Sequence, residues 1–157
     1  MKKLILPVLF IFILPLFLVS CASPYLKGMS EGGEKVYLNT DAIEKTKAFS
    51  LYLKSDQDER AKIVYLFRRI LKSDQLNYYH DDNLYSAQDT YKAGLWLLDN
   101  RYEEGQSARE FAKDQVLVDE ASGKPNYVKL PDGTIHIGYY LLINELDLLE
   151  EKTAPIK

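Results

Sequence analysis

Residues 1–20 have the layout of an export signal, and this limits which part of the chain can form a folded domain. Lys2 and Lys3 give a short positive region, an apolar run follows over residues 4–17, and small residues come next. A membrane-spanning helix needs about 17 to 25 apolar residues, whereas this run is short and contains two prolines. We therefore predict a signal peptide, whose removal leaves 137 of the 157 residues, enough for one domain.

The only cysteine, Cys21, directly follows this segment. A disulfide within one chain is therefore excluded, and a catalytic thiol would need a base held nearby. Leu18-Val19-Ser20-Cys21 resembles the lipobox of bacterial lipoproteins. This resemblance implies cleavage before Cys21, a thioether-linked diacylglycerol on its sulfur and an acyl chain on its new amine. Two or three acyl chains would hold the protein firmly in a membrane, because each buried methylene contributes about 0.8 kcal/mol.

The residues after the cysteine bear on which membrane is used. Ala22 and Ser23 occupy these positions, and neither is the Asp that resembles an inner-membrane retention signal in enteric bacteria. We therefore expect an exported protein anchored in the outer membrane of a bacterial envelope.

The charge of the remaining chain excludes one class of partner. Without Lys2 and Lys3, 18 basic side chains stand against 23 acidic ones, a net charge of −5. An acidic surface gives no electrostatic footprint for nucleic acid and does not attract anionic headgroups. Membrane lipid bound through Cys21 is thus the expected partner, and an envelope protein or a glycan is a further candidate.

Composition and periodicity divide the mature chain into three parts. Residues 21–40 mix Ser, Gly, Pro and charged residues without a hydrophobic period, which predicts a lipidated cysteine on a flexible tether. Residues 41–151 carry helical periodicity and form the predicted domain, and residues 152–157 are a C-terminal tail.

Five segments of this domain predict helices. The clearest has an apolar stripe at offsets 0, 1, 4, 7 and 8 from Ile63 and a basic opposite face that includes Arg68 and Arg69. The expected helix starts are Asp41, Ser55 or Asp56, Ser86 with Asp89 three residues on, Ser107 with Glu110 three residues on, and Tyr139. In the last helix we expect the leucines to be buried and Asn144, Glu145 and Glu150 to face water.

The other segments predict little regular structure. Residues 73–85 lose the helical period and read as a polar loop that carries aromatics. Residues 126–137 alternate around Pro131-Asp132-Gly133, which predicts a small β-hairpin. The predicted fold is therefore mainly α, a single compact domain of about five helices with a hairpin near the C-terminus.

The order of these features resembles a family of small exported bacterial proteins known as domain of unknown function 5329. The resemblance rests on Ser122-Gly123-Lys124-Pro125 with Tyr127 and Val128, followed by Glu145-Leu146. The family loop aromatic-x-Arg-Asn-Gly-x-x-Tyr reads here as Tyr78-x-His80-Asp81-Asp82-x-x-Tyr85, and a family histidine in the next helix is Ala93. The resemblance implies a fold, and no catalytic residue is transferred.

The candidate chemical groups are few. His80, Asp81 and Asp82 have the ligand types of a divalent-metal site, but adjacent loop residues seldom converge on one ion, so we expect no metal and no cofactor. His136 in the predicted hairpin reads as a structural or exposed histidine. Glu145, with Asp147, Glu150 and Glu151, reads as a solvated helix face rather than paired catalytic acids.

Tyrosine is unusually frequent, with 12 Tyr against 6 Phe and 1 Trp. Tyrosine rings suit sugar or protein surfaces, although they also cap the edges of small cores. The candidate binding surface comprises Tyr78, Tyr79, His80, Asp81, Asp82 and Tyr85. We therefore expect a binding or structural module of the envelope, the alternative being an envelope hydrolase that uses acids near residues 80–82.

Overall fold

The structure is a computed structural model that describes residues 23–155. The predicted signal peptide, the lipobox and Cys21 lie outside the described residues.

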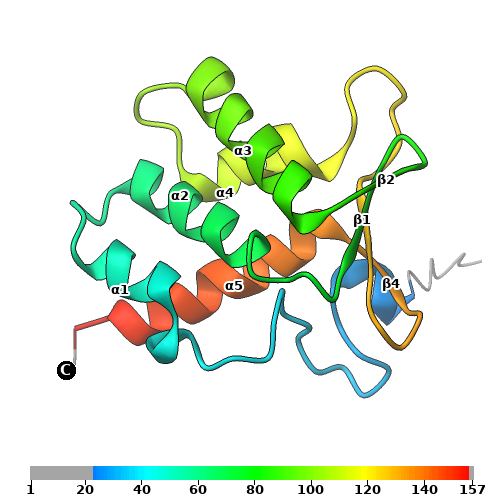
Figure 1. Ribbon diagram of the computed structural model, residues 1–157, viewed down its shortest axis with the longest axis horizontal. Helices are drawn as coiled ribbons and strands as arrows, with labels where there is room; N and C mark the ends of the chain where they lie inside the picture. The colour runs from blue at the N-terminus through cyan, green and yellow to red at the C-terminus, as the bar shows by residue number, and fades with distance from the viewer. Residues whose placement is uncertain (1–22, 156–157) are drawn as a thin grey trace, which may run out of the picture.

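Helices form the larger part of the domain (Figure 1). The long helix α5 runs through its centre, with α2 and α4 packed against it and α3 packed on α2. The α-helices are α1 (Lys47–Leu53), α2 (Glu59–Ile70), α3 (Ala87–Arg101), α4 (Ala108–Ala112) and α5 (Gly138–Thr153). Two 3-10 turns, η1 (Pro24–Lys27) and η2 (Ile43–Lys45), precede them, and a π-helical turn η3 (Lys113–Leu117) extends α4.

A four-stranded antiparallel sheet stands at one end of the helices. Its strands are β1 (Asn77–His80), β2 (Asn83–Tyr85), β3 (Tyr127–Lys129) and β4 (Ile135–Ile137), in the order β2-β1-β3-β4. The predicted C-terminal hairpin is present as β3–β4. The fold is therefore mixed α and β rather than mainly α, because the hairpin is only half of a sheet.

The second hairpin, β1–β2, replaces the predicted polar loop. His80 pairs with Asn83, and the two residues between them, Asp81 and Asp82, have φ angles of 46° and 63°. Two successive residues in the left-handed region form the primed turn that matches strand twist, and Asp tolerates this region better than most residues. Asp-Asp is a weaker signal than Asn-Gly, which explains why the sequence did not reveal this hairpin.

The helix starts agree with the sequence in two places and differ in two. Ser107 and Glu110 form the predicted reciprocal capping box, and the Ser86 hydroxyl accepts from the Asp89 amide as expected. The first α-helix, α1, begins after Thr46 rather than after Asp41. Helix α2 is capped by Asp58 rather than by Ser55 or Asp56. Side-chain capping of the first-turn amides fixes all four starts.

Three of the five residues of the predicted apolar stripe of α2 are buried, whereas Val64 and Leu71 are only partly buried. Ile63, Phe67 and Ile70 are at most 4% exposed. Arg69 was expected on the basic outer face but is 2% exposed. It lies one helical turn from Tyr65 and Leu66, on the same buried side of α2.

The partner of Arg69 is Glu145 on α5, which was expected to face water and is instead fully buried. Arg69 Nε donates to Glu145 Oε2 at 2.8 Å and Nη2 donates to Oε1 at 3.2 Å, while the Leu38 amide donates to Oε1 at 2.9 Å. Burial of a carboxylate is tolerated where a charge partner and hydrogen bonds replace water. Asn144, also expected at the surface, is 7% exposed.

Asn144 holds down the segment that was predicted as a flexible tether. Its Nδ2 donates to the carbonyl oxygens of Gly28 and Val36, at 2.9 and 2.8 Å. Leu38 is 1% exposed, within the core. Over residues 23–40 the tether prediction is therefore wrong: polar groups of α5 satisfy the backbone of this segment, although its own sequence shows no hydrophobic period.

Candidate ligand-binding cavity

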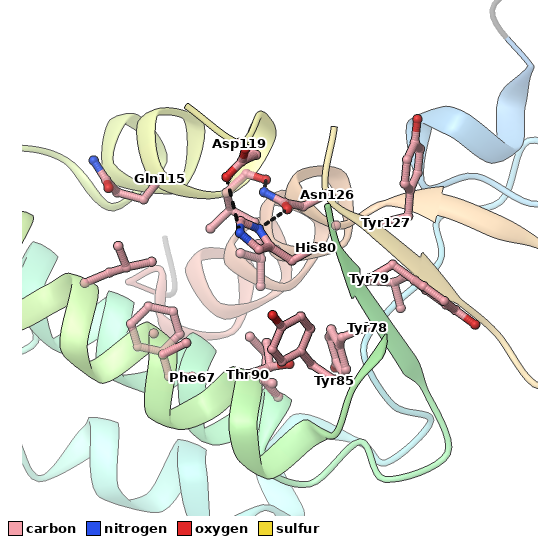
Figure 2. Close-up of a pocket in the computed structure, with 18 of the residues that line it drawn as sticks. Phe67, Tyr78, Tyr79, His80, Tyr85, Thr90, Gln115, Asp119, Asn126 and Tyr127 are labelled. Atoms are coloured by element: carbon pink, nitrogen blue, oxygen red, sulfur yellow. Dashed lines mark hydrogen bonds and ion pairs between the residues drawn. The ribbon is translucent and has the colours of Figure 1, made fainter. Parts of the chain in front are cut away.

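A cavity of about 450 Å³ lies between the sheet, α3 and η3 (Figure 2). This volume falls in the range of small-molecule sites. Its walls are mainly apolar and aromatic, with a few polar side chains among them. They include Leu38, Phe67, Ile70, Tyr78, His80, Tyr85, Thr90, Ala93, Gly94, Trp96, Leu97, Gln115, Val116, Asp119, Asn126, Val128 and Leu142.

The sheet supplies one wall, which includes Tyr78, Tyr85 and Val128 from one cross-strand row. Tyr85 pairs with Tyr78, Tyr78 with Val128, and Val128 with His136. Directly opposed residues in antiparallel strands project to the same face. Tyr78, Val128 and His136 are buried, while Tyr85 at the open end is 39% exposed, so this inner row leads from the core to the cavity mouth.

Helix α3 supplies the facing wall, and a glycine allows it to approach. A Cβ placed on Gly94 would lie 2.7 Å from the ring of Phe67, a distance that atoms do not tolerate. The missing side chain therefore lets the Phe67 ring from α2 reach the cavity past α3. Trp96, also on α3 and lining the cavity, is 56% exposed and is the only tryptophan of the chain.

The polar part of the wall is centred on His80. The Asn126 side chain is oriented by its Nδ2, which donates to the Val116 carbonyl at 2.9 Å. Its Oδ1 consequently faces His80 and accepts from Nδ1 at 2.8 Å. The other ring nitrogen, Nε2, lies 3.2 Å from Asp119 Oδ2. Both imidazole nitrogens are thus engaged by neighbours (Figure 2).

Asp119 is held in its charged form. The Ser122 amide donates to Asp119 Oδ1 at 2.6 Å. Hydrogen bonding from Ser122, aided by the nearby His80, keeps the pKa of the Asp119 carboxyl below its usual value. Asp119 is therefore ionised near neutral pH and lies beside the His80 ring.

The structure divides the six residues of the predicted binding surface among three places. Tyr78, His80 and Tyr85 face the cavity. Tyr79 also borders it, but its side chain points to the other side of the sheet (Figure 2). Asp81 and Asp82 lie in the hairpin turn, where both pair with Lys124 outside the cavity. The sequence pattern did not assign these residues to faces of the sheet.

The remaining candidates are outside the cavity. His136 is 1% exposed, its ring contacts Tyr25 edge to face, and burial lowers its pKa. Asp147 and Glu150 both pair with Arg109. Within residues 23–155, no group of three His, Cys, Asp or Glu side chains is placed to hold a metal ion.

Several residues of the cavity were not singled out by the sequence. Asn126 and Asp119 are far from His80 in the chain and meet it only in the fold, while Trp96 reaches the cavity from α3. The signals that would have indicated them are a lone exposed tryptophan on an otherwise amphipathic helix and a glycine in its interior.

Comparisons with family models, curated proteins and solved structures gave no match for this chain. The resemblance to domain of unknown function 5329 therefore stays a prediction. No helix within the described part of the chain is long and apolar enough to cross a bilayer.

Proposed function

We propose that this chain is a lipid-anchored protein of the bacterial cell envelope whose domain binds a small, largely apolar molecule in the cavity. The lipobox-like stretch that ends at Cys21 supports the anchor, with the outer membrane as the expected site. The observation that carries the binding function is the 450 Å³ cavity with aromatic walls and one ordered polar cluster.

The chemistry of the walls supports the class of ligand. Ligand pockets are mostly apolar with a few placed polar groups that fix orientation. Here Phe67, Tyr85 and Trp96 offer aromatic rings, while Thr90 and Gln115 offer hydrogen-bonding groups. A flat or chain-like apolar molecule with one polar end matches this distribution.

The arrangement of His80 supports binding over hydrolysis. A general base must present a free nitrogen to the reacting group. In this cavity Nδ1 is bonded to Asn126 and Nε2 faces Asp119, while Asp81 and Asp82 pair with Lys124 away from the cavity. The polar wall is therefore arranged to hold its own shape and to orient a ligand.

Trp96 makes the proposal testable by fluorescence. The chain from Ser23 onward is titrated with N-phenyl-1-naphthylamine, and energy transfer from the tryptophan reports occupancy. We expect saturable binding of one probe per chain that is lost in Ala93→Phe, which fills the cavity beside Trp96. Ala42→Phe, at an exposed alanine remote from the cavity, should bind as the unmodified protein does. Non-saturable binding, or equal binding by both variants, would contradict the proposal.

The anchor has a separate test in cells. Cys21→Ala should abolish incorporation of a labelled palmitate and leave the precursor uncleaved, whereas Ser23→Ala should be labelled and processed normally. An acylated product of mature size from the Cys21→Ala gene would refute the lipobox reading.

A further inference from the structure

The outer face of the sheet carries a row of apolar side chains. Ile137 pairs with Tyr127, Tyr127 with Tyr79, and Tyr79 with Leu84, so these four residues form one row across all four strands. It lies on the opposite face from the inner row, because side chains alternate along each strand. Figure 2 shows Tyr79 and Tyr127 pointing away from the cavity.

This outer row is partly open to solvent, because Leu84 is exposed while Tyr79, Tyr127 and Ile137 are half-buried. Leu84 is 59% exposed, and Ile135, on the same face of β4, is 46% exposed. In Figure 1 the α-helices all lie on the other side of the sheet. Exposed apolar side chains that are contiguous across a sheet mark a contact surface, whereas single ones are ordinary.

The charge of this face is also unlike that of the whole protein. The second cross-strand row consists of Ile135, Lys129 and Asn77. Lys129 is thus the only charged residue in the two rows, and it is positive, whereas the chain as a whole is acidic. Tyrosine and isoleucine beside a lysine is a combination that suits the boundary between headgroups and acyl chains.

The position of the lipid anchor indicates which partner covers the outer face of the sheet. Turn η1, which begins at Pro24, packs against β4 at the edge of the sheet. Cys21 precedes Pro24 by three positions in the sequence, and three positions span at most about 11 Å of chain. Acyl chains on Cys21 would therefore enter a bilayer directly beside β4.

We propose that the outer face of the sheet, with Leu84, Tyr79, Tyr127, Ile135 and Ile137, rests on the lipid bilayer. This inference depends on the proposed lipid anchor, and it goes further by giving the domain a fixed orientation on the membrane. The anchor supplies the affinity, and the apolar row together with Lys129 selects which side of the domain faces the lipid.

The test uses the lipidated full chain in vesicles of phosphatidylethanolamine and phosphatidylglycerol. Acylation consumes the thiol of Cys21, so an introduced cysteine is the only one that a fluorescent nitrobenzoxadiazole label can reach. Leu84→Cys places the label on the outer face. Leu53→Cys is the matched control, because Leu53 is 47% exposed at the end of α1, on the far side of the domain from the sheet.

We expect the label at position 84 to shift to shorter wavelength on vesicles and to be quenched by nitroxide lipids, while the label at position 53 remains as in water. If the protein binds vesicles but both labels remain exposed to water, the proposed orientation is wrong and the lipid anchor is still supported. Energy transfer between chains labelled at position 84 would show that a second copy of the chain covers the outer face. This result would also contradict the proposed orientation on the bilayer. A chain that does not float with vesicles and whose Cys21 is reactive would refute the anchor, and with it this inference.

Discussion

Two polar clusters in this domain contain the same kinds of groups but differ in exposure. The Arg69–Glu145 pair joins α2 to α5, and its side chains are 2% and 0% exposed. The His80–Asp119 pair joins the β1–β2 hairpin to the segment after η3, and its side chains are 50% and 14% exposed. The first is enclosed on all sides, whereas the second borders a cavity.

The difference shows how one fold separates stability from recognition. Glu145 receives three hydrogen bonds and leaves no room for a ligand, so its cluster fixes the positions of α2, α5 and Leu38. His80 is held by two neighbours on one side and keeps its ring edge toward Tyr85 and the cavity. We expect substitutions in the first cluster to act on folding and those in the second to act on binding.

The largest expected effect is that of Glu145→Ala. Removal of one partner from a buried ion pair typically costs about 3 to 5 kcal/mol, because the remaining charge is left without compensation. Urea unfolding followed by circular dichroism measures this cost. Glu151→Ala, at an exposed position of the same helix, should change the free energy of unfolding by less than about 0.5 kcal/mol. Equal costs would mean that the Arg69–Glu145 cluster does not stabilise the core.

Gly94→Ala should destabilise the domain, against the usual trend. In a helix interior this change normally stabilises by about 0.5 to 1 kcal/mol. Here the new methyl group meets the Phe67 ring at 2.7 Å, and overpacking typically costs about 1 to 3 kcal/mol. The cost of Gly94→Ala should be smaller when this change is added to Phe67→Leu than when it is made in the unmodified protein. A rise in stability on Gly94→Ala would show that α3 and Phe67 are not in contact.

A smaller effect is expected where ion pairs are half exposed, and it depends on pH. Burial alone would raise the pKa of Asp147 and Glu150, but hydrogen bonds and the charges of Arg109 and its neighbours outweigh burial and lower both pKa values. A carboxyl with a lowered pKa stabilises the fold above its unfolded pKa of about 4, and this contribution is lost as the pH falls through the folded value.

Arg109→Met should therefore cost up to about 1 kcal/mol at pH 7 and almost nothing near pH 2. Thermal unfolding at the two pH values gives the comparison. Arg68→Met, on the outer side of α2, should have little effect at either pH. A cost of Arg109→Met that is the same at both pH values would show that the carboxylates contribute nothing through this arginine.

The smallest effect on stability is expected for His80→Ala, which should act on binding instead. The side chain is half exposed, so the free energy of unfolding should change by less than about 1 kcal/mol. Probe affinity should fall severalfold, because Asn126 and Asp119 lose the ring that orders the polar wall. If His80→Ala binds the probe with full affinity, His80 does not contribute to the binding site.

The sequence predicts most of the helices because their evidence is local. The stripe from Ile63 and the capping box at Ser107 depend on neighbours within a few residues, and both are confirmed. Arg69 and Glu145 were misplaced because long-range pairing overrides the polarity of a single residue. The order of residues 23–40 likewise depends on hydrogen bonds from Asn144, more than 100 positions away.

The cavity was only partly foreseeable for the same reason. His80 and Tyr85 attracted notice through their neighbours in the chain, but the split of Tyr78 and Tyr79 between two faces requires the strand register. Asn126 and Asp119 join the site only after β3 pairs with β1. A strand of three or four residues, such as these, carries too little periodicity to be recognised alone.

The central claim is that the cavity side of the sheet binds small apolar molecules and the outer face does not. Two-dimensional amide NMR of the chain from Ser23 onward, titrated with N-phenyl-1-naphthylamine, tests it most directly. The account predicts saturable shifts at Gly94, Trp96 and His80 and none at Leu84 or Ile135, with the cavity shifts lost in Ala93→Phe. Shifts confined to the outer face, or cavity shifts that persist in Ala93→Phe, would contradict it.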